Sequence, residues 1–346
     1  MGEAIITSRG GSQEDPVPVV PGYHSILVTL RDYQGKLLKD YPINCKDGSV
    51  WYNYKTNETG KALFTCNSGA ANISINNVVD GYRYLDIPNH IMNCDAPIGG
   101  QTRLAFNIPK TTTKNFSFGA GTSKIRFLHN QECSGYIVGG GGGGTYYYDY
   151  YSSTKSSGGG GGYLNYINNC IFKQNENINI VVGHGGAGRG GHNSWASNGP
   201  GGSGQTSYIS NYPYSANGGQ GGNALSKKGG IGFGNGGYCY QYTFIKPTNS
   251  GSSLAGGGGG ATDQTLYISD GTNPSDYPEK YIKGYPFGGL PAYYTQQGGG
   301  NLIRAKSGDI PGGGGAGGSS DNGQTGYSSL GGAGGSGICK LNMVNY

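Results

Sequence analysis

The sequence is poor in charge and has no long apolar run. Only 12% of its 346 residues are charged, the formal net charge is +5, and the basic residues are scattered with a single adjacent pair. This distribution excludes the basic footprint of a nucleic-acid-binding protein. No stretch approaches the roughly 20 apolar residues that a membrane span requires. We therefore expect no nucleic-acid partner and no membrane insertion.

A secretion signal and helical periodicity are also missing. Residues 1–9 carry Glu3 where a signal peptide would be basic, and they reach polar residues before an apolar core forms. No segment repeats apolar residues at helical spacing over about 11 residues. The sequence predicts an all-β protein with essentially no α-helix.

The cysteines lack the pattern of a disulfide framework or a metal site. There are seven, an odd number, widely spaced and never in a C-x-x-C pair. We interpret them as buried thiols of a chain made in a reducing cytosol.

Glycine is what the sequence has in excess. The chain contains 72 glycines, about three times average usage, without the strict repeat of collagen. Residues 1–118 hold 11 of them and residues 119–346 hold 61. The chain therefore divides into two physically different parts.

The first part begins with an extended arm and continues as short strands. Residues 1–21, with their Gly-Gly pair and spaced prolines, predict a tether that is extended rather than folded. From there, runs such as Ser25–Leu30 and Ala62–Thr65 recur at regular intervals between turn residues. This spacing predicts a small β-sandwich over residues 22–116.

One turn of this part resembles a known module. The run Thr56-Asn57-Glu58-Thr59-Gly60-Lys61-Ala62-Leu63-Phe64 is similar to the T-D-x-x-G-x-a-x-F hairpin of carboxypeptidase-regulatory-like immunoglobulin-type modules, with Asn57 in place of the usual Asp. The resemblance covers residues 22–108. It implies an immunoglobulin-like β-sandwich, with a hairpin at this turn, and implies no chemistry.

The second part, residues 117–346, alternates β-like runs with glycine tracts such as 139–144, 158–162, 256–260 and 312–315. Flexible linkers are one interpretation. Against it, each tract lies within one or two residues of a strand-like run. The alternative is packed polyglycine II helices, which have three residues per turn and no internal hydrogen bonds, so that every N–H and C=O can bond a neighbour. Inward positions then require glycine, and exposed ones can differ, as in Gly-His-Gly-Gly-Ala-Gly-Arg-Gly-Gly at 183–191.

The order of these segments resembles a viral family. Tyr136-Ile137-Val138 running into six glycines, and Ile178–Val182 running into Gly-His-Gly-Gly-Ala-Gly, are similar to glycine-rich domains of bacteriophage tail fibres and tip adhesins over residues 119–346. The resemblance implies a structural virion protein of the phage tail, assembled in the bacterial host cytoplasm in several copies. Loops between the glycine rods would bind a bacterial surface polysaccharide or outer-surface protein. We expect the arm and the immunoglobulin-like domain to contact other tail proteins.

Two other functions remain open at this point. A non-adhesive virion decoration or spacer protein would need the same stiffness without a receptor. A bacterial cell-surface or matrix adhesin would need a signal and an anchor, which the sequence does not display.

Motifs with sharper chemistry lack their structural context. Gly183–Gly188 matches G-x-G-x-x-G, but no Asp or Glu occurs from 177 to 262 to hold a ribose. Ser152–Lys155 matches S-x-x-K without a helix to aim the lysine, and His184 with His192 lacks a third metal ligand. We expect no enzyme activity, no catalytic residue, no cofactor and no metal.

Tyrosine and tryptophan in the polar loops are the candidate receptor-binding residues. Such side chains offer a large amphipathic contact area at low entropic cost and can stack on sugars. The other interpretation is that they cap and shield the glycine rods. The candidates are Tyr146, Tyr147, Tyr148, Tyr150, Tyr151, Trp195, Tyr208, Tyr212, Tyr214, Tyr293 and Tyr294.

Overall fold

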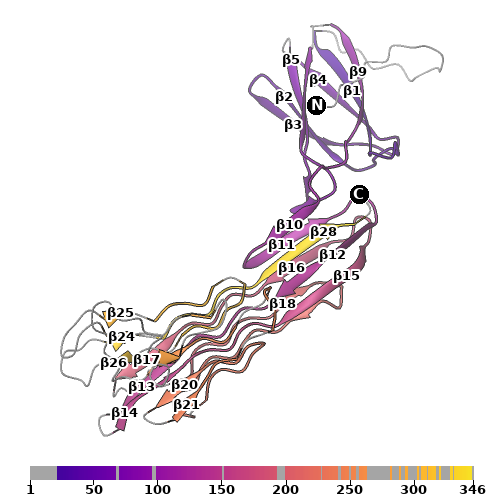
Figure 1. The fold of residues 1–346 in the computed structure, drawn as a ribbon. Helices are drawn as coiled ribbons and strands as arrows, with labels where there is room; N and C mark the ends of the chain where they lie inside the picture. The colour runs from indigo at the N-terminus through magenta and orange to yellow at the C-terminus, as the bar shows by residue number, and fades with distance from the viewer. Residues whose placement is uncertain are drawn as a thin grey trace. The chain divides into compact units, whose positions relative to one another are not determined.

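Strands and glycine tracts make up the structure, and no helix occurs in the part of the chain that it describes, which confirms the all-β prediction (Figure 1). It is a computed structural model. The predicted arm, residues 1–21, lies outside the description. The described residues are 22–67, 70–95, 99–149, 152–192, 199–226, 228–240, 243–248, 251–254, 257–262, 281–282, 288–289, 293–294, 302–303, 305–309, 311–316, 319–320, 328–329 and 331–344.

The chain forms two compact units, and it enters the first unit three times. The first unit comprises Met1–Lys114 together with Lys124–Gln131 and Ile171–Asn177. The second comprises Asn115–Ser123, Glu132–Cys170 and Ile178–Tyr346. Two short segments of the glycine-rich half thus belong to the first unit.

Two sheets build the first unit. Their strand orders are β4-β1-β9 and β3-β2-β5-β8, and the unit also holds a short antiparallel pair, β6 and β7, that belongs to a further sheet. The only parallel pairing inside these two sheets joins β1 to β9. The strands are β1 His24–Arg31, β2 Pro42–Asp47, β3 Val50–Lys55, β4 Lys61–Cys66, β5 Ala70–Ile75, β6 Val78–Val79, β7 Tyr82–Tyr84, β8 His90–Asp95 and β9 Gln101–Asn107.

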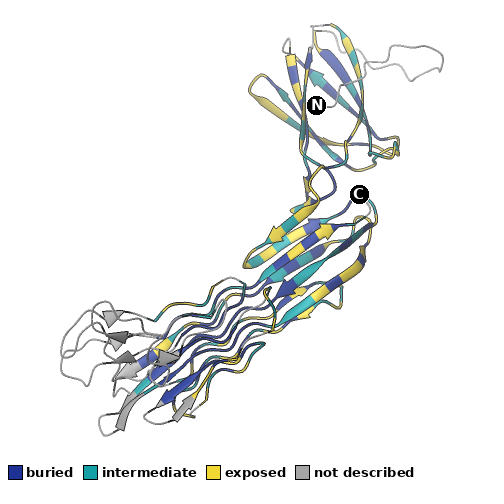
Figure 2. Cartoon of the chain, in the orientation of Figure 1, coloured by how far each residue is buried: buried dark blue, intermediate teal, exposed yellow. Residues whose placement is uncertain are grey.

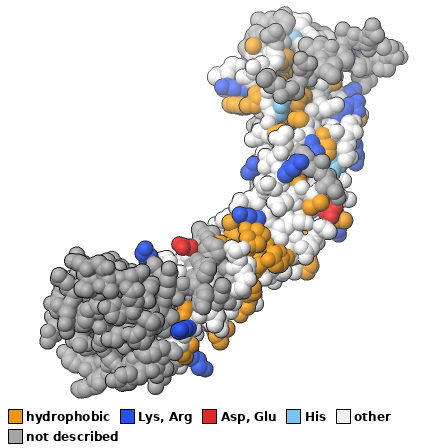
Figure 3. Space-filling model, in the orientation of Figure 1, with side chains coloured by type: hydrophobic (Ala, Val, Ile, Leu, Met, Phe, Trp, Pro, Cys, Tyr) orange, Lys and Arg blue, Asp and Glu red, His pale blue; other side chains and the backbone are white. Residues whose placement is uncertain are grey.

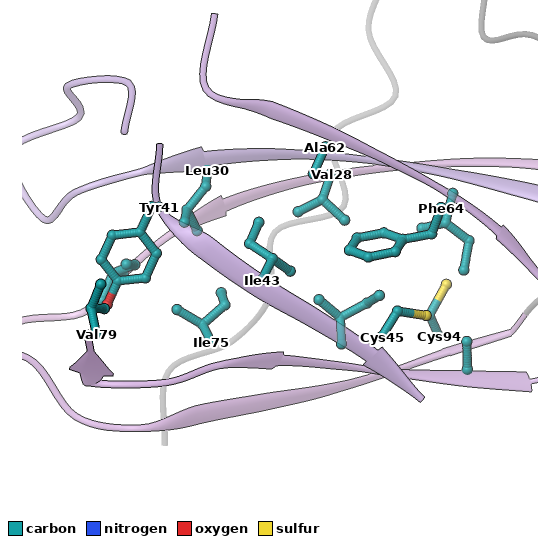
Figure 4. Close-up of a cluster of buried hydrophobic side chains, with 14 of the residues drawn as sticks. Val28, Leu30, Tyr41, Ile43, Cys45, Ala62, Phe64, Ile75, Val79 and Cys94 are labelled. Carbon is teal, nitrogen blue, oxygen red and sulfur yellow. The ribbon is translucent and has the colours of Figure 1, made fainter. Parts of the chain in front are cut away.

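The two sheets share one hydrophobic core. Both β2 and β4 alternate strictly between buried and partly exposed residues, as strands with one face against a core do. Ile43 of β2 and Phe64 of β4 are completely buried in the same cluster, to which Val28 of β1 also belongs (Figure 4). The core therefore comes from the period-two pattern of the sequence.

The turn with the module resemblance forms, but it does not make a hairpin. The Asn57 side-chain oxygen accepts hydrogen bonds from the amides of Thr59 and Lys61 at 3.0 Å, and Gly60 has a φ of 66°. Asn57 thus does the work of the usual Asp. The strands on either side, β3 and β4, pair with β2 and β1 in different sheets. The expected hairpin is wrong, since the turn carries the chain from one sheet to the other.

A buried carboxylate holds the returning segment 124–131. Asp86 is fully buried, and both of its oxygens lie 2.9 Å from the Leu128 amide. The Tyr33 hydroxyl donates a third bond to it at 3.1 Å. Burial raises the pKa of the Asp86 carboxyl, although these donors act in the opposite direction. The phenyl rings of Phe127 and Phe172, 5.4 Å apart, stack one returning segment on the other.

Strands gather at both ends of the glycine tracts of the second unit (Figure 1). We call one group the strand end: β10 Asn115–Phe118, β12 Gln131–Val138, β15 Leu164–Phe172, β16 Ile178–Val182, β18 Ser207–Ile209, β19 Ser215–Ala216 and β28 Ile338–Met343. We call the other the hairpin end: β13 Thr145–Asp149, β14 Ser152–Ser157, β17 Arg189–His192, β20 Tyr238–Tyr240, β21 Thr243–Ile245, β22 Ala261–Thr262, β23 Tyr281–Ile282, β24 Tyr293–Tyr294, β25 Leu302–Ile303, β26 Ser319–Ser320 and β27 Ser328–Ser329. The remaining strand, β11 Gly121–Arg126, pairs with β7 through Ile125 and Arg126.

The tracts that run between the two ends are neither helix nor strand. We number them in chain order as tract 1 (139–144), tract 2 (158–162), tract 3 (183–188), tract 4 (199–206), tract 5 (217–222), tract 6 (228–237), tract 7 (257–260), tract 8 (312–316) and tract 9 (331–337). Tract 1 leads from β12 to β13, and tract 2 returns from β14 to β15. Figure 1 shows them as undulating lines lying side by side.

Tract 1 is hydrogen-bonded on all sides. Its successive amides donate to the tract 2 segment, tract 4 and tract 9, and this order of partners then repeats, with N···O distances of 2.8–3.0 Å. Its carbonyls accept from tract 5, from the tract 3 segment and from tract 8. The partner thus recurs every three residues, and six neighbouring segments surround tract 1.

Contact between the tracts leaves no room for a side chain. A Cβ atom on any of the six glycines of tract 1 would lie 1.9–2.2 Å from a backbone oxygen of a neighbouring tract. Tract 2 is surrounded in the same way, because its amides donate in turn to tracts 6, 8 and 5. Both tracts are buried along their length (Figure 2). Unbroken glycine therefore marks an interior tract.

In the peripheral tracts, another residue stands in place of every third glycine. In tract 3, His184 and Ala187 are exposed while Gly183 and Gly186 are buried. Tract 5 and the residue after it carry a polar residue at 217, 220 and 223, with buried glycines at 219 and 222. The non-glycine residues thus occupy the outward positions, as the sequence predicts for tract 3.

All seven cysteines are buried and free, which confirms the interpretation as thiols. The closest pair, Cys45 and Cys66, has its sulfur atoms 3.6 Å apart without a bond. Burial raises the pKa of Cys339 to about 12. Few thiolates are therefore present at neutral pH.

The packing predicts that one methyl group inside tract 1 damages the fold, whereas the same group outside the tracts does not. Gly143→Ala would place Cβ 2.1 Å from the Ala187 oxygen, so we expect stability to fall by about 2 kcal/mol or more. Gly119→Ala is the matched control, because a Cβ there meets no atom within 4 Å. Denaturant unfolding of both variants measures the difference, and equal midpoints would contradict the packing argument.

Candidate receptor-binding surface

The tyrosine-rich run between tracts 1 and 2 forms an antiparallel pair, β13 and β14. Tyr146 lies opposite Ser156 and Tyr147 opposite Lys155, and the register shifts before Asp149. On its other side, β13 pairs in parallel with β17. The resulting sheet has the order β17-β13-β14-β20-β21 and lies at the hairpin end. Tracts 1, 2 and 3 thus fix the position of the strands that present these tyrosines.

Tyr146 is buried in this sheet. Its side chain is 1% exposed, and a Cβ on the neighbouring Gly190 would lie 2.1 Å from the ring. The ring therefore covers the backbone of β17 where glycine leaves space for it. Tyr146 thus packs inside the sheet and has almost no surface exposed to solvent.

Tyr147 points to the other face of the strand and is partly exposed. The Lys155 ammonium lies 5.6 Å from its ring centroid, a cross-strand cation–π contact. Tyr148 also lies on β13, where the structure describes its backbone alone. Tyr150, Tyr151 and Trp195 lie outside the described residues.

Tyr293 and Tyr294 form β24, which pairs with β25. This pair belongs to the hairpin end, because β25 contacts β27, β27 pairs with β26, and β26 contacts β14. Their side chains lie outside the description. The backbone nonetheless brings positions 147, 293 and 294 to the same end of the tracts.

The other three candidates lie at the opposite end. Tyr208 of β18 is 44% exposed, and Tyr212 and Tyr214 follow it in the loop to β19. The strand before this loop, β18, pairs with β16, and tract 3 begins where β16 ends. Tract 3 ends at β17, which pairs with β13. Six residues of polyglycine II would span ~19 Å. The tyrosine-rich loops therefore form two separate groups.

Exposed aromatic side chains also occur on strands, outside the tyrosine-rich loops that the sequence analysis selected. Tyr166 on β15 is 51% exposed, and in the first unit Trp51 and Tyr54 on the edge strand β3 are 53% and 48% exposed. In β15 the alternation of buried residues is broken near Asn169, which has a φ of 48°. Periodicity alone could not have assigned Tyr166 to the surface.

The glycine-rich domain family matches residues 117–343. The chain belongs to this family. Residues before 117, which include most of the first unit, lie outside the match.

No curated protein is similar enough to match the chain. Among solved structures, a streptococcal ancillary pilin is similar over 34% of this chain and 41% of the pilin chain, with 11% identity and a TM-score of 0.22. The match thus spans about two fifths of the pilin's length.

The motifs with sharper chemistry lie on tract 3 and on β14. No group of three or more His, Cys, Asp or Glu side chains that could hold a metal occurs in the described part of the chain. His184 is an exposed residue of tract 3, and the Lys155 ammonium lies over the Tyr147 ring. A helix that is long and apolar enough to span a bilayer is likewise missing from the residues described.

Two neighbouring tyrosines should respond differently to truncation. Tyr146→Ala removes a buried ring, so we expect a loss of about 3–5 kcal/mol of stability. Tyr147→Ala removes one exposed cation–π contact, and its effect should stay within about 1 kcal/mol. Thermal unfolding of both variants tests this, and a similar loss in both would show that burial does not separate their roles.

Proposed function

We propose that the glycine tracts are polyglycine II helices that pack laterally. The recurrence of hydrogen-bond partners every three residues supports this assignment, because polyglycine II has three residues per turn and leaves its backbone groups free. We propose further that the first unit is an immunoglobulin-like sandwich. Two sheets around one core, and the Asn57 turn, support it.

The function that we propose is a structural protein of a bacteriophage virion, at the tail fibre or tip, that binds the bacterial surface. The hairpin end is the receptor-binding surface in this proposal, with Tyr147 and the loops that contain Tyr150, Tyr151, Trp195, Tyr293 and Tyr294 in contact with a surface polysaccharide or protein. The second group, around Tyr208, serves as a flanking contact. The arm and the first unit attach the chain to other tail proteins, and no catalytic group is needed.

One observation supports this proposal: the hairpin end is attached to a lattice of backbones that hydrogen-bond one another. Loops on such a scaffold can change sequence without disturbing the packing, because the tracts contact one another through backbone atoms. A binding surface on rigid supports loses little entropy when it binds. Several copies on one particle would add avidity to weak individual contacts.

Deleting the gene from the phage that encodes the chain should leave particle assembly intact and reduce adsorption to host cells by at least tenfold. Virions that carry Tyr147→Ala should assemble normally and adsorb more slowly, because the variant removes contact area without unfolding the domain. Adsorption rate constants measure this, with mass spectrometry confirming the chain in purified particles. Tyr166→Ala, which removes an exposed tyrosine of β15 that has no part in the proposed contact, is the matched control.

The alternatives predict other outcomes. If particles without the chain adsorbed at the normal rate but were less stable, the chain would be a decoration or spacer protein. Detection of the chain on bacterial cells and not in virions would indicate a cell-surface adhesin.

A further inference from the structure

A groove of about 320 Å³ lies between tracts 4, 5 and 6 of the glycine-rich unit. Tract 4 provides one wall, tract 5 the floor, and the start of tract 6 the other wall. The volume is at the lower end of the range for ligand sites. The residues that concern us are Ser203, Gln220, Gly221, Asn223, Lys228 and Ile231.

The groove is held open by bonds between the tracts. The Gly201 amide donates to the Gly222 oxygen at 2.9 Å, and the Gln220 amide donates to the Ile231 oxygen at 2.7 Å. Asn223 and Lys228 exchange backbone hydrogen bonds at 3.1 and 3.3 Å. Each wall is therefore tied to the floor without a ligand, and the site is formed in advance.

Three hydrogen-bonding groups that line the groove have no partner among the described residues. The Gly221 amide, the Ser203 hydroxyl and the Gln220 side chain make no hydrogen bond to any residue that the structure describes. Together they offer donors and acceptors within one small concavity. Ile231, 54% exposed, adds an apolar surface at the edge.

The groove carries positive charge with no acid to balance it. Its lining includes Lys228 and neither Asp nor Glu. The chain from 177 to 262 contains four basic residues and no acidic one, so this segment has a charge of +4. The Lys228 ammonium forms no ion pair with the described residues. Figure 3 shows the same imbalance on the face drawn, where Lys and Arg are more frequent than Asp and Glu.

We propose that this groove binds a uronic acid residue of an acidic polysaccharide. The Lys228 ammonium meets the sugar carboxylate, while Gly221, Gln220 and Ser203 pair with ring hydroxyls and Ile231 covers the apolar face of the ring. A peptide would need a deep apolar pocket for an anchor side chain, and this lining is mostly polar. The proposal goes beyond the receptor-binding role of the loops, since the groove lies on the flank of tracts 4, 5 and 6.

Calorimetric titration of the full chain with hexagalacturonate tests the proposal. Methyl-esterified hexagalacturonate is the matched ligand, because it keeps the sugar and removes its charge. We expect saturable binding of the acid, weakened at least fivefold by esterification and by Lys228→Gln. Lys228→Arg should retain most of the affinity, and Lys246→Gln, an exposed lysine outside the groove, should bind as the native chain does.

Ser203→Ala and Gln220→Ala separate sugar recognition from simple anion binding. Each should weaken hexagalacturonate about threefold or more, and equimolar inorganic phosphate should not displace the sugar. Absence of binding at 10 mM oligosaccharide, equal affinity for the ester, an unchanged Lys228→Gln variant or displacement by phosphate would each overturn the proposal. These titrations need no virion, so their failure is distinguishable from failure of the adsorption experiment.

Discussion

Lateral hydrogen bonding between backbones is the interaction on which the second unit depends. An ordinary domain buries apolar side chains, whereas the interior of this one consists of peptide groups that bond their neighbours at 2.7–3.0 Å along tracts 1 and 2. Each such bond contributes about 1 kcal/mol net, and ordering a glycine costs ~0.5–1 kcal/mol more than ordering an alanine. One tract alone gains almost nothing, so the tracts are stable only when they surround one another. Cooperativity follows directly from this near balance.

Buried apolar side chains, which the middle of the lattice lacks, lie at the two ends of the tracts. At the hairpin end, Tyr146 and Tyr238 are fully buried, and at the strand end Ile137 and Val182 are. These side chains close the lattice against water with conventional apolar packing, worth about 1.5–3 kcal/mol per large residue. The second unit is thus a polar middle between two apolar ends. The strands hold the tracts in place, and the tracts hold the strands apart.

The sequence predicts whether a tract lies inside the unit or at its surface, but it does not predict which tracts are its neighbours. Six consecutive glycines predict an interior position for tract 1, and the exposed His184 and Ala187 follow from the every-third-residue pattern of tract 3. Nothing in the sequence says that tract 1 bonds tracts 2, 4 and 9, because glycine tracts are chemically alike. In the same way, the turn at Asn57 is predictable from its side chain, while the sheet that each flanking strand joins is set by distant residues.

The candidate site shows the same division at finer scale. Composition identifies the tyrosine-rich loops, but Tyr146 and Tyr147 differ only by the pleat of β13, and which face is buried depends on Gly190 of the neighbouring strand β17. The groove is harder still to foresee, because tracts 4, 5 and 6 create it together. Its only trace in the sequence is the absence of acids from 177 to 262, which becomes meaningful once Lys228 is placed beside Gln220 and Ser203. Where backbone atoms build the scaffold, side chains at the outward positions are free of packing duties. Chemistry can therefore be placed along the flank as well as at the ends, and the charge of the groove is a consequence of that freedom.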